Sequence, residues 1–432
     1  MSKIDGKLKT ESILIHGGQE PDPNTGSIAV PIHQTTAYQF ESTQHAADLF
    51  ALKQFGNIYV RLQNPTTTVL EKRMALLDGG AGALAASSGM AAISLAVLNI
   101  VQCGDEIIAS DSLYGGTYTL FSNTFKKFGI KTHFTKMSDL DGIQKLINKK
   151  TKAIYAETLG NPKLDISDIE ELAKLAHKNN IPLIVDNTLT PYILKPIEYG
   201  ADIVVYSATK FLCGHGTSLG GVIVDSGKFD WDNGKFPVIS APDESYHGLK
   251  FIEEFKQLGN VAYIIKARLN LMRDLGSVIS PFNSFLILQG LETLHLRMQR
   301  HCENAARIAE FLRGNKNVAW INYPGFEDNS EYKKARKYLK QYSGSLIGFG
   351  IKGGINAGKK FIESLELVSH VVNLGDARTL ATHPATTTHQ QLTKEEQLAS
   401  GVTEDFIRLS IGIENAEDII ADIDNALKES QI

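Results

Sequence analysis

The sequence predicts an α/β protein with a large domain built on a mostly parallel sheet and a smaller α+β domain. The main observation is that short β-type runs alternate with helical patterns between about residues 66 and 275. Strands separated by helices of this length are typical of a parallel sheet covered on both faces. The strand candidates are Glu106–Ser110, Lys131–Phe134, Lys152–Glu157, Pro182–Asp186, Asp202–Ser207 and Gly221–Asp225.

One helix between these strands has both a start signal and an apolar stripe. The pattern predicts a helix over Asp168 to Asn179, whose apolar residues recur at three- and four-residue spacing. Ser167 and Glu170 have the spacing of a capping box, in which each side chain would bind a free backbone amide at the helix start.

The second predicted domain begins with a long amphipathic helix. Apolar residues keep the helical spacing from Leu291 and the pattern ends at Gly314. The strand candidates Ser345–Ile351 and Phe406–Ile411, and a final helix from Asn415, complete a small α+β unit. Residues 226–260 interrupt the earlier alternation with prolines and polar turns, and we interpret them as an irregular insertion.

These patterns divide the chain into three parts. Residues 1–65 are rich in Gly, Pro and Asn and are predicted to form an extended arm. Residues 66–275 would form the large domain, and residues 276–432 the small C-terminal domain. A chain of 432 residues is long enough to bury a sizeable core in such an arrangement.

Composition excludes several classes of protein. Lys and Arg number 44 and Asp and Glu 48, so the net charge of −4 does not favour binding to nucleic acid or to an anionic membrane. Three widely spaced cysteines without a CxxC pair argue against a disulfide framework and a zinc site, and favour a cytoplasmic protein. The twelve histidines include no HxxxH or HExxH pair, so no metal is expected.

One uncharged stretch, residues 79–104, is long enough to suggest a membrane span. Its first half is Gly, Ala and Ser, however, and Asn99 and Gln102 lie near its end, so it is only weakly hydrophobic. A loop followed by a buried helix over about Met90 to Val101 fits the sequence better.

The strongest local chemical feature is the run from Val204 to Lys210, a strand that ends in a lysine among small residues. Desolvation at the end of a buried strand lowers the pKa of a lysine and makes its amine nucleophilic. The alternative is a strand-end lysine that reaches solvent. The glycines at residues 214–221 do not form a dinucleotide-binding motif, because a further strand, and not a helix, follows them.

Asp186 ends the apolar run before it, 24 residues ahead of Lys210. Lysine chemistry of the Schiff-base kind requires a carbonyl cofactor with an electron sink, and pyridoxal phosphate provides one when a buried carboxylate keeps its ring nitrogen protonated. Both residues would lie at the carboxyl edge of the sheet, where open α/β sheets bind ligands. Taken alone, such an aspartate is often only a turn or cap residue.

A cofactor phosphate also requires hydrogen-bond donors. Ser88 precedes the uncharged helix, whose first backbone amides and positive dipole end can bind an anion. A glycine there lets a phosphate approach closely. None of these residues is specific alone; the candidates are Ser88, Gly89 and Met90 at the helix start, the hydroxyls of Ser207 and Thr209, and Tyr114 as a ring that could stack on a planar cofactor.

Together these segments resemble the pyridoxal-phosphate-dependent enzymes of cysteine and methionine metabolism, over essentially the whole chain. The set is specific because five short segments occur in the family's order and spacing: Ser87-Ser88-Gly89-Met90, Asp111-Ser112-Leu113-Tyr114-Gly115, Asn161-Pro162, Val185-Asp186-Asn187-Thr188 and Ser207-Ala208-Thr209-Lys210. The resemblance implies the aspartate-aminotransferase type of fold (fold type I) and pyridoxal 5'-phosphate as cofactor.

The resemblance also implies a role for individual residues. Lys210 would form the Schiff base with the cofactor, Asp186 would contact its ring nitrogen, and Tyr114 would stack on its ring and take part in catalysis. The remaining implied cofactor contacts are Ser88, Gly89, Met90, Asn161, Ser207 and Thr209. Arg408 would bind the substrate carboxylate, with Asn161 and Asn373 beside it.

Two further residues give the arm a function. Tyr59 and Arg61 match positions with which the family reaches the cofactor phosphate of a neighbouring subunit. The resemblance therefore implies dimers with shared active sites, and we expect a homotetramer built from them.

Within the family, the sequence most resembles the O-acetylhomoserine sulfhydrylases. The more discriminating features are the 226–260 insertion and the segment Asn373-Leu374-Gly375-Asp376-Ala377. The implied reaction is γ-replacement, in which O-acetyl-L-homoserine and sulfide give L-homocysteine and acetate for methionine biosynthesis. The alternatives are a methionine or cystathionine γ-lyase and an O-succinylhomoserine sulfhydrylase. Gly116 lies where methionine γ-lyases typically carry a cysteine, which argues against the lyase.

Overall fold

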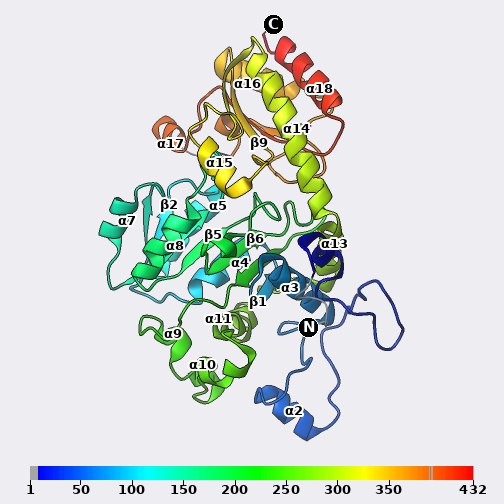
Figure 1. Ribbon diagram of the computed structural model, residues 1–432, viewed down its shortest axis with the longest axis vertical. Helices are drawn as coiled ribbons and strands as arrows, with labels where there is room; N and C mark the ends of the chain where they lie inside the picture. The colour runs from blue at the N-terminus through cyan, green and yellow to red at the C-terminus, as the bar shows by residue number, and fades with distance from the viewer. Residues whose placement is uncertain (1–7, 389, 391–392, 432) are drawn as a thin grey trace.

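The protein is built on two β-sheets that lie one above the other along the long axis of the molecule (Figure 1). The computed structural model describes residues 8–388, 390 and 393–431. A seven-stranded sheet has the order β1-β7-β6-β5-β4-β2-β3, and every strand except β7 runs in the same direction. A five-stranded sheet, mostly antiparallel, has the order β10-β11-β12-β9-β8. The predicted fold class is confirmed.

The strands and helices have the following bounds. The strands of the larger sheet are β1 (Gly82–Ala86), β2 (Glu106–Ser110), β3 (Lys131–Thr135), β4 (Thr151–Glu157), β5 (Leu183–Asp186), β6 (Ile203–Ser207) and β7 (Gly221–Asp225). Those of the smaller sheet are β8 (Val318–Asn322), β9 (Leu346–Ile351), β10 (Ser369–His370), β11 (Leu380–Thr382) and β12 (Phe406–Ser410). The main helices are α1 (Thr10–His16), α2 (Thr43–Phe50), α3 (Pro65–Asp78), α4 (Gly89–Leu98), α5 (Gly115–Thr119), α7 (Leu140–Leu146), α8 (Ile169–Lys178), α13 (Pro281–Glu292), α14 (Leu294–Gly314), α15 (Tyr332–Leu339), α16 (Gly354–Glu363) and α18 (Ala416–Glu429). Shorter helical segments are α6 (Phe125–Lys127), α9 (Pro237–Ser240), α10 (Phe251–Glu254), α11 (Ala262–Lys266), α12 (Arg273–Leu275) and α17 (Lys394–Ala399), and the wider π-helical turn η6 (Ala267–Met272) follows α11.

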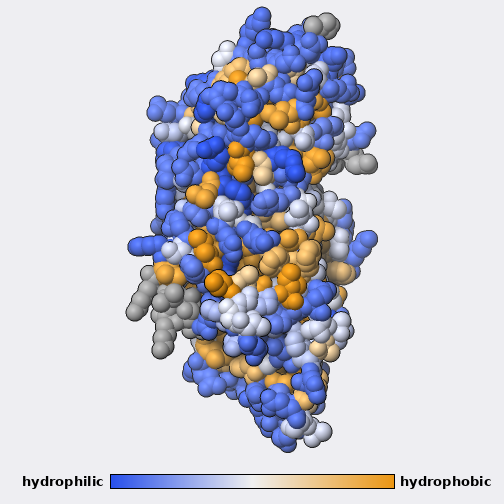
Figure 2. Space-filling view, turned by 90° about the vertical axis from the view of Figure 1, so that its right-hand side faces the viewer, coloured by the Kyte–Doolittle hydropathy of each residue, from blue (hydrophilic) through white to orange (hydrophobic). Residues whose placement is uncertain are grey.

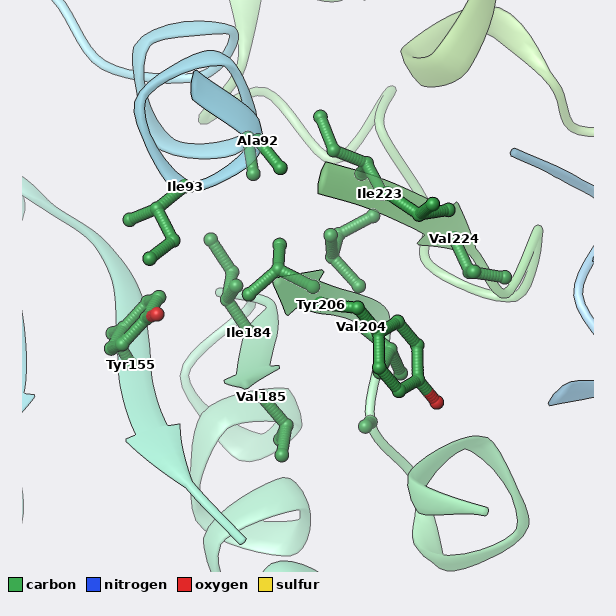
Figure 3. Packing of buried hydrophobic residues seen from close by; sticks show 14 of the residues in the cluster. Ala92, Ile93, Tyr155, Ile184, Val185, Val204, Tyr206, Ile223 and Val224 are labelled. Carbon is green, nitrogen blue, oxygen red and sulfur yellow. The ribbon is translucent and has the colours of Figure 1, made fainter. Parts of the chain in front are cut away.

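Helix α4 forms the centre of the larger core. The Ser88 side chain caps it by accepting a hydrogen bond from the Ala91 amide at 3.1 Å. Figure 3 shows Ile93 of α4 on the same side of the sheet as Ile184, while Val185, the next residue of β5, lies on the opposite side. The uncharged stretch of the sequence is therefore a capped helix packed against a sheet. No helix among the described residues is long and apolar enough to cross a membrane.

Two details of the sequence-based prediction are wrong. The sequence GALAA forms the edge strand β1, which was predicted as loop because Gly and Ala have low β propensity. The capping box at the start of α8 does not form. The Ser167 hydroxyl instead donates to the Glu157 carbonyl at 2.7 Å, and the Tyr338 hydroxyl from α15 accepts from the Glu170 amide at 3.2 Å. Tertiary contacts replace the local cap.

The predicted long helix is two helices that meet at Thr293. Leu291 lies in α13, and α14 begins at Leu294. The first part of α14 packs in the same hydrophobic cluster as the larger sheet, through residues that include Met298 and Cys302. Its second part packs beneath the smaller sheet, through residues that include Ile308 and Leu312. The helix therefore joins the two cores.

The N-terminal segment is not extended throughout its length. Helix α1 packs against α3 and α13, and its Leu14 side chain is fully buried. Beyond it the chain leaves the body of the molecule toward α2, at the bottom of Figure 1. Large apolar side chains are exposed along this part, including Ile28, Phe50 and Phe55.

The loop that follows Lys210 is fixed by close packing against α13. The Arg297 guanidinium of α14 donates to the carbonyl oxygens of Phe211 and Gly290 at 2.8 and 2.7 Å. A Cβ atom on Gly290 would lie only 2.3 Å from the Cys213 carbonyl oxygen, a contact that the backbone could relieve only by moving.

We therefore expect Gly290→Ala to destabilise the protein by about 1–3 kcal/mol, because overpacking against backbone strains the core. Gly314→Ala is the matched control, since the space around this helical glycine is open and alanine favours a helix. Chemical denaturation of both variants measures the difference. Equal stabilities of the two would contradict the packing described for Gly290.

Candidate active site

The predicted cofactor residues lie at the carboxyl edge of the larger sheet. Asp186 ends β5 and Ser207 ends β6, and Lys210 follows three residues later. Tyr114 and Asn161 lie in the loops after β2 and β4. Because these strands are parallel, their carboxyl ends meet at one edge, which is the usual ligand side of an open α/β sheet.

The Lys210 side chain is half-buried and contacts a loop of the smaller sheet. Its Nζ donates a hydrogen bond to Oδ1 of Asn373, in the loop between β10 and β11. Burial, together with the positive charge of nearby Arg408, lowers the pKa of Lys210 to about 8. The structure thus favours the nucleophilic lysine over a strand-end lysine in solvent.

Arg408, on β12, connects the two sheets. Its Nη1 donates to Oδ1 of Asn161 at 3.2 Å, and its Nη2 donates to the carbonyl oxygen of Asn373 at 3.0 Å. Its Nε is buried without a hydrogen-bond partner among the described residues. Burial lowers the pKa of Arg408 to about 10. A planar, dehydrated guanidinium with an unused donor fits a carboxylate ligand.

Asp186 has the environment expected of a carboxylate that contacts a cofactor nitrogen. It is 8% exposed, and its Oδ1 accepts from the Thr188 amide at 2.9 Å. The Tyr155 hydroxyl donates to its Oδ2 at 3.4 Å. Burial raises the pKa of Asp186, and the hydrogen bonds from Thr188 and Tyr155 oppose this rise. An ionised Asp186 would therefore be stabilised further by a cationic ring nitrogen.

The start of α4 and the end of β6 approach each other closely enough to form a phosphate cradle. A Cβ atom on Gly89 would lie 2.6 Å from Cβ of Ser207, so only glycine fits there. The first amides of α4, at Gly89 and Met90, have no acceptor within the helix. The Thr209 hydroxyl accepts from the Gly220 amide at 3.1 Å. These residues fit the phosphate of pyridoxal phosphate.

The Tyr114 backbone is fixed by a hydrogen bond, and its ring lies against Gly116. Its amide donates to Oε1 of Glu157 at 2.7 Å, while its side chain is 52% exposed. A Cβ atom on Gly116 would lie 2.5 Å from Cε1 of the Tyr114 ring. The ring therefore occupies the space that a side chain at position 116 would need.

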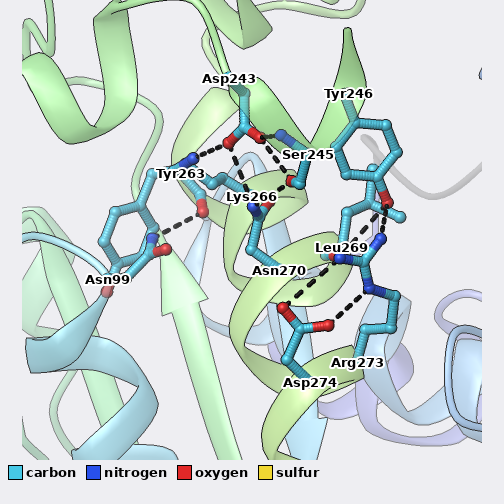
Figure 4. A network of polar contacts seen from close by, with 10 residues as sticks. All are labelled: Asn99, Asp243, Ser245, Tyr246, Tyr263, Lys266, Leu269, Asn270, Arg273 and Asp274. Atoms are coloured by element: carbon cyan, nitrogen blue, oxygen red, sulfur yellow. Dashed lines mark hydrogen bonds and ion pairs between the residues drawn. The ribbon is translucent and has the colours of Figure 1, made fainter.

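Tyr59 and Arg61 are not brought to this edge. The Arg61 guanidinium lies 5.4 Å from the Tyr59 ring, and its Nη1 donates to the carbonyl oxygen of Arg273. Arg273 in turn donates from Nη1 to the Tyr246 hydroxyl at 3.0 Å. Figure 4 shows this arginine beside η6, together with the ion pair of Asp243 and Lys266. The 226–260 insertion thus anchors the segment that holds Arg61.

Three residues around the site were missed from the sequence. Tyr155 and Thr188 donate to Asp186, and the Thr188 hydroxyl also accepts from the Ser207 amide at 2.8 Å. Glu157 ends β4 as Asp186 ends β5, so the same sequence pattern, a carboxylate that closes an apolar run, could have identified it. Tyr155 has no comparable signal, because its contact with Asp186 depends on the register between β4 and β5.

Comparisons with known proteins agree with this geometry. A family model described as Cys/Met metabolism PLP-dependent enzyme matches residues 11–428. The chain is 56% identical to the O-acetyl-L-homoserine sulfhydrylase of Leptospira meyeri, over 98% of this chain and 97% of that protein. It is 46% identical to O-acetyl-L-homoserine sulfhydrylase 1 of Thermus thermophilus, over 97% of this chain and 100% of that protein.

A solved structure extends the similarity to three dimensions. A Campylobacter jejuni protein, described as a candidate O-acetylhomoserine (thiol)-lyase, superposes with a TM-score of 0.94 at 39% identity, covering 98% of this chain and 100% of that one. Its crystal structure carries N'-pyridoxyl-lysine-5'-monophosphate at one lysine. The chain described here therefore belongs to the pyridoxal-phosphate-dependent enzymes of cysteine and methionine metabolism.

Proposed function

We propose that the protein converts O-acetyl-L-homoserine and sulfide to L-homocysteine and acetate. The observation that carries this proposal is the cluster of half-buried Lys210 and Asn373 with buried Arg408, which places an amine of lowered pKa beside a carboxylate-binding guanidinium. Relatives named as O-acetyl-L-homoserine sulfhydrylases, 46–56% identical over nearly the full chain, support the choice of substrates.

Lys210 acts as the base in this proposal. When bound, pyridoxal phosphate supplies an electron sink for the charge that develops at the substrate Cα. The Lys210 amine takes the proton from Cα and moves a proton at Cβ, and its lowered pKa keeps an appreciable fraction neutral near pH 7. Acetate then leaves from Cγ, and sulfide takes its place.

Arg408 orients the amino acid for this proton transfer. Its fork accommodates the α-carboxylate, and Asn161 and Asn373 keep the guanidinium in position through their hydrogen bonds at Nη1 and Nη2. Because Arg408 lies on the smaller sheet and Lys210 beside the larger one, the substrate would bind where the two sheets meet.

The position of Tyr114 supports γ-replacement over methionine γ-lyase activity. A cysteine at position 116, typical of those lyases, would contact the Tyr114 ring as it lies here and require it to move. With glycine at this position, the ring stays close to the backbone of α5.

The proposed assembly is a cytoplasmic homotetramer built from two dimers, with active sites shared across each dimer. Tyr59 and Arg61 are absent from their own site but accessible, Tyr59 being 40% exposed, which suits contact with a neighbouring subunit's phosphate. Figure 2 shows apolar side chains gathered over the middle of one face, the side on which α1, α13 and the start of α14 lie. Exposed apolar residues of these helices include Ile15, Phe282 and Leu296.

Steady-state assays test the reaction. We expect homocysteine from O-acetyl-L-homoserine and sulfide at a kcat/KM at least about tenfold above that with O-succinyl-L-homoserine, because a site fitted to acetyl must discriminate against the added carboxylate. Keto acid formation from methionine or cystathionine at a rate equal to homocysteine synthesis would contradict the proposal. A preference for the succinyl ester would show that O-succinyl-L-homoserine is the substrate instead.

The capture of cofactor by cofactor-free protein should depend on the pKa of Lys210. The neutral amine is the nucleophile, so the capture rate should rise with pH and reach half its maximum near pH 8. At pH 7 the neutral fraction is roughly 10²-fold larger than for an ordinary lysine. Stopped-flow absorbance measures the rate. A half-maximum near pH 10 would show that Lys210 is solvated.

Mixed subunits test the shared active site. Lys210→Ala and Arg61→Ala proteins should each be inactive at limiting cofactor, the second because a phosphate contact is lost. Mixing and reassembly should restore about a quarter of the wild-type activity, because half of the dimers are mixed and each of these has one intact site. If Arg61 acts within its own subunit, mixing would restore none.

A further inference from the structure

Two buried carboxyl groups lie side by side at the ligand edge of the sheet, and the roles assigned above use only one of them. Glu157 ends β4 and Asp186 ends β5, and the two residues are direct partners in the parallel register. Glu157 is 6% exposed and Asp186 is 8% exposed. Neighbouring carboxylates in a dehydrated site repel each other, so both do not ionise together.

The surroundings of the two groups differ. Asp186 receives hydrogen bonds from Thr188 and Tyr155, which favour its ionised form. Glu157 receives one, from the Tyr114 amide. Within the described part of the chain, no lysine or arginine forms an ion pair with Glu157.

We propose that Glu157 is a positioning residue that works as a neutral carboxyl group, fixing the Tyr114 backbone while leaving the negative charge of the pair on Asp186. The proposal rests on the roles assigned above to Asp186 and Tyr114, but not on the identity of the substrate.

The charges that face Glu157 all act in the same direction. Asp186 faces it from β5 and Asp165 from the loop after β4, and both disfavour a second anion. Burial is the largest cause and, together with these two charges, raises the pKa of Glu157 well above its usual range, while the hydrogen bond from the Tyr114 amide opposes the rise. A cationic ring nitrogen at Asp186 would stabilise the Asp186 carboxylate directly. If the pair binds one proton, that proton would then lie on Glu157.

A neutral Glu157 still accepts a hydrogen bond, and this defines its function. Its Oε1 holds the Tyr114 amide at 2.7 Å, at the point where the chain turns from β2 into α5. The backbone position there sets where the tyrosine ring can lie over the cofactor. An ionised carboxylate at position 157 would accept the same hydrogen bond, but it would also add a second negative charge beside Asp186.

Two substitutions separate the acceptor from the charge. Glu157→Gln keeps the acceptor oxygen and is always neutral, whereas Glu157→Met has similar volume and no acceptor. Asp225→Asn is the matched control, because Asp225 is a fully buried carboxyl at the end of β7 that accepts from the Gly227 amide at 2.9 Å. Purified proteins are stripped of cofactor and titrated with pyridoxal phosphate, and visible absorbance and circular dichroism are recorded against pH.

The Glu157→Gln protein should bind the cofactor within about twofold of wild type and keep the midpoint pH of its visible band within about 0.3 unit, because no charge is lost. The Glu157→Met protein should bind it about tenfold more weakly and lose visible circular dichroism, because a buried amide is left unpaired and the ring is no longer fixed. Asp225→Asn should leave both readouts unchanged.

A shift of the midpoint by about one pH unit or more in Glu157→Gln would show that Glu157 is ionised in the native protein, and would overturn the proposal. Equal cofactor binding by the Gln and Met variants would also overturn it, because the acceptor would then have no positioning role. These readouts need no substrate, so they stand apart from the sulfhydrylase assay that tests the proposed function.

Discussion

The close placement of two partly dehydrated cations is the constraint on which the rest of the site depends. The positive charge of Arg408 weakens the ionised form of Lys210, and burial lowers the pKa of both residues. Asn373 is the shared partner that makes this arrangement tolerable, since it accepts from both residues, with its amide oxygen and with its carbonyl oxygen. Neutral dipoles compensate only part of the lost hydration. The site is therefore electrostatically incomplete without anions, which a phosphate and a carboxylate provide.

The two carboxylates of the site also lie at this edge of the larger sheet, apart from the two cations. Asp186 and Glu157 close two adjacent strands, and neither forms an ion pair with the buried cations among the described residues. This separation of charge across a few strand ends suits a cofactor that has an anionic phosphate at one end and a cationic ring nitrogen at the other. Glu157 and Asp186 occupy the last positions of β4 and β5, and Lys210 follows the end of β6 by three residues, so the strand order fixes this separation.

Much of this arrangement follows from the sequence, and the exceptions have physical causes. The alternation of strands and helices predicted the larger sheet, and the lysine and aspartate that close apolar runs predicted the centre of the site. Strand β1 was missed because alanines form a strand only when a neighbouring strand is present to pair with them. The contact between Asn373 and Lys210 was not predictable, because it joins residues 163 positions apart in sequence. The predicted cap at Ser167 does not form because the Ser167 hydroxyl donates instead to the carbonyl oxygen of Glu157.

Helix α14 has a consequence for how the site can move. One continuous rod of 21 residues packs its first turns in the larger core and its later turns in the smaller one, with the change between Cys302 and Ala305. Arg408 lies on the smaller sheet and Lys210 beside the larger one, so α14 is one of the elements that fix the distance between them. A change in this distance would require α14 to bend near its middle, between Cys302 and Ala305. The distance between the carboxylate-binding arginine and the lysine is therefore linked to the stiffness of this helix.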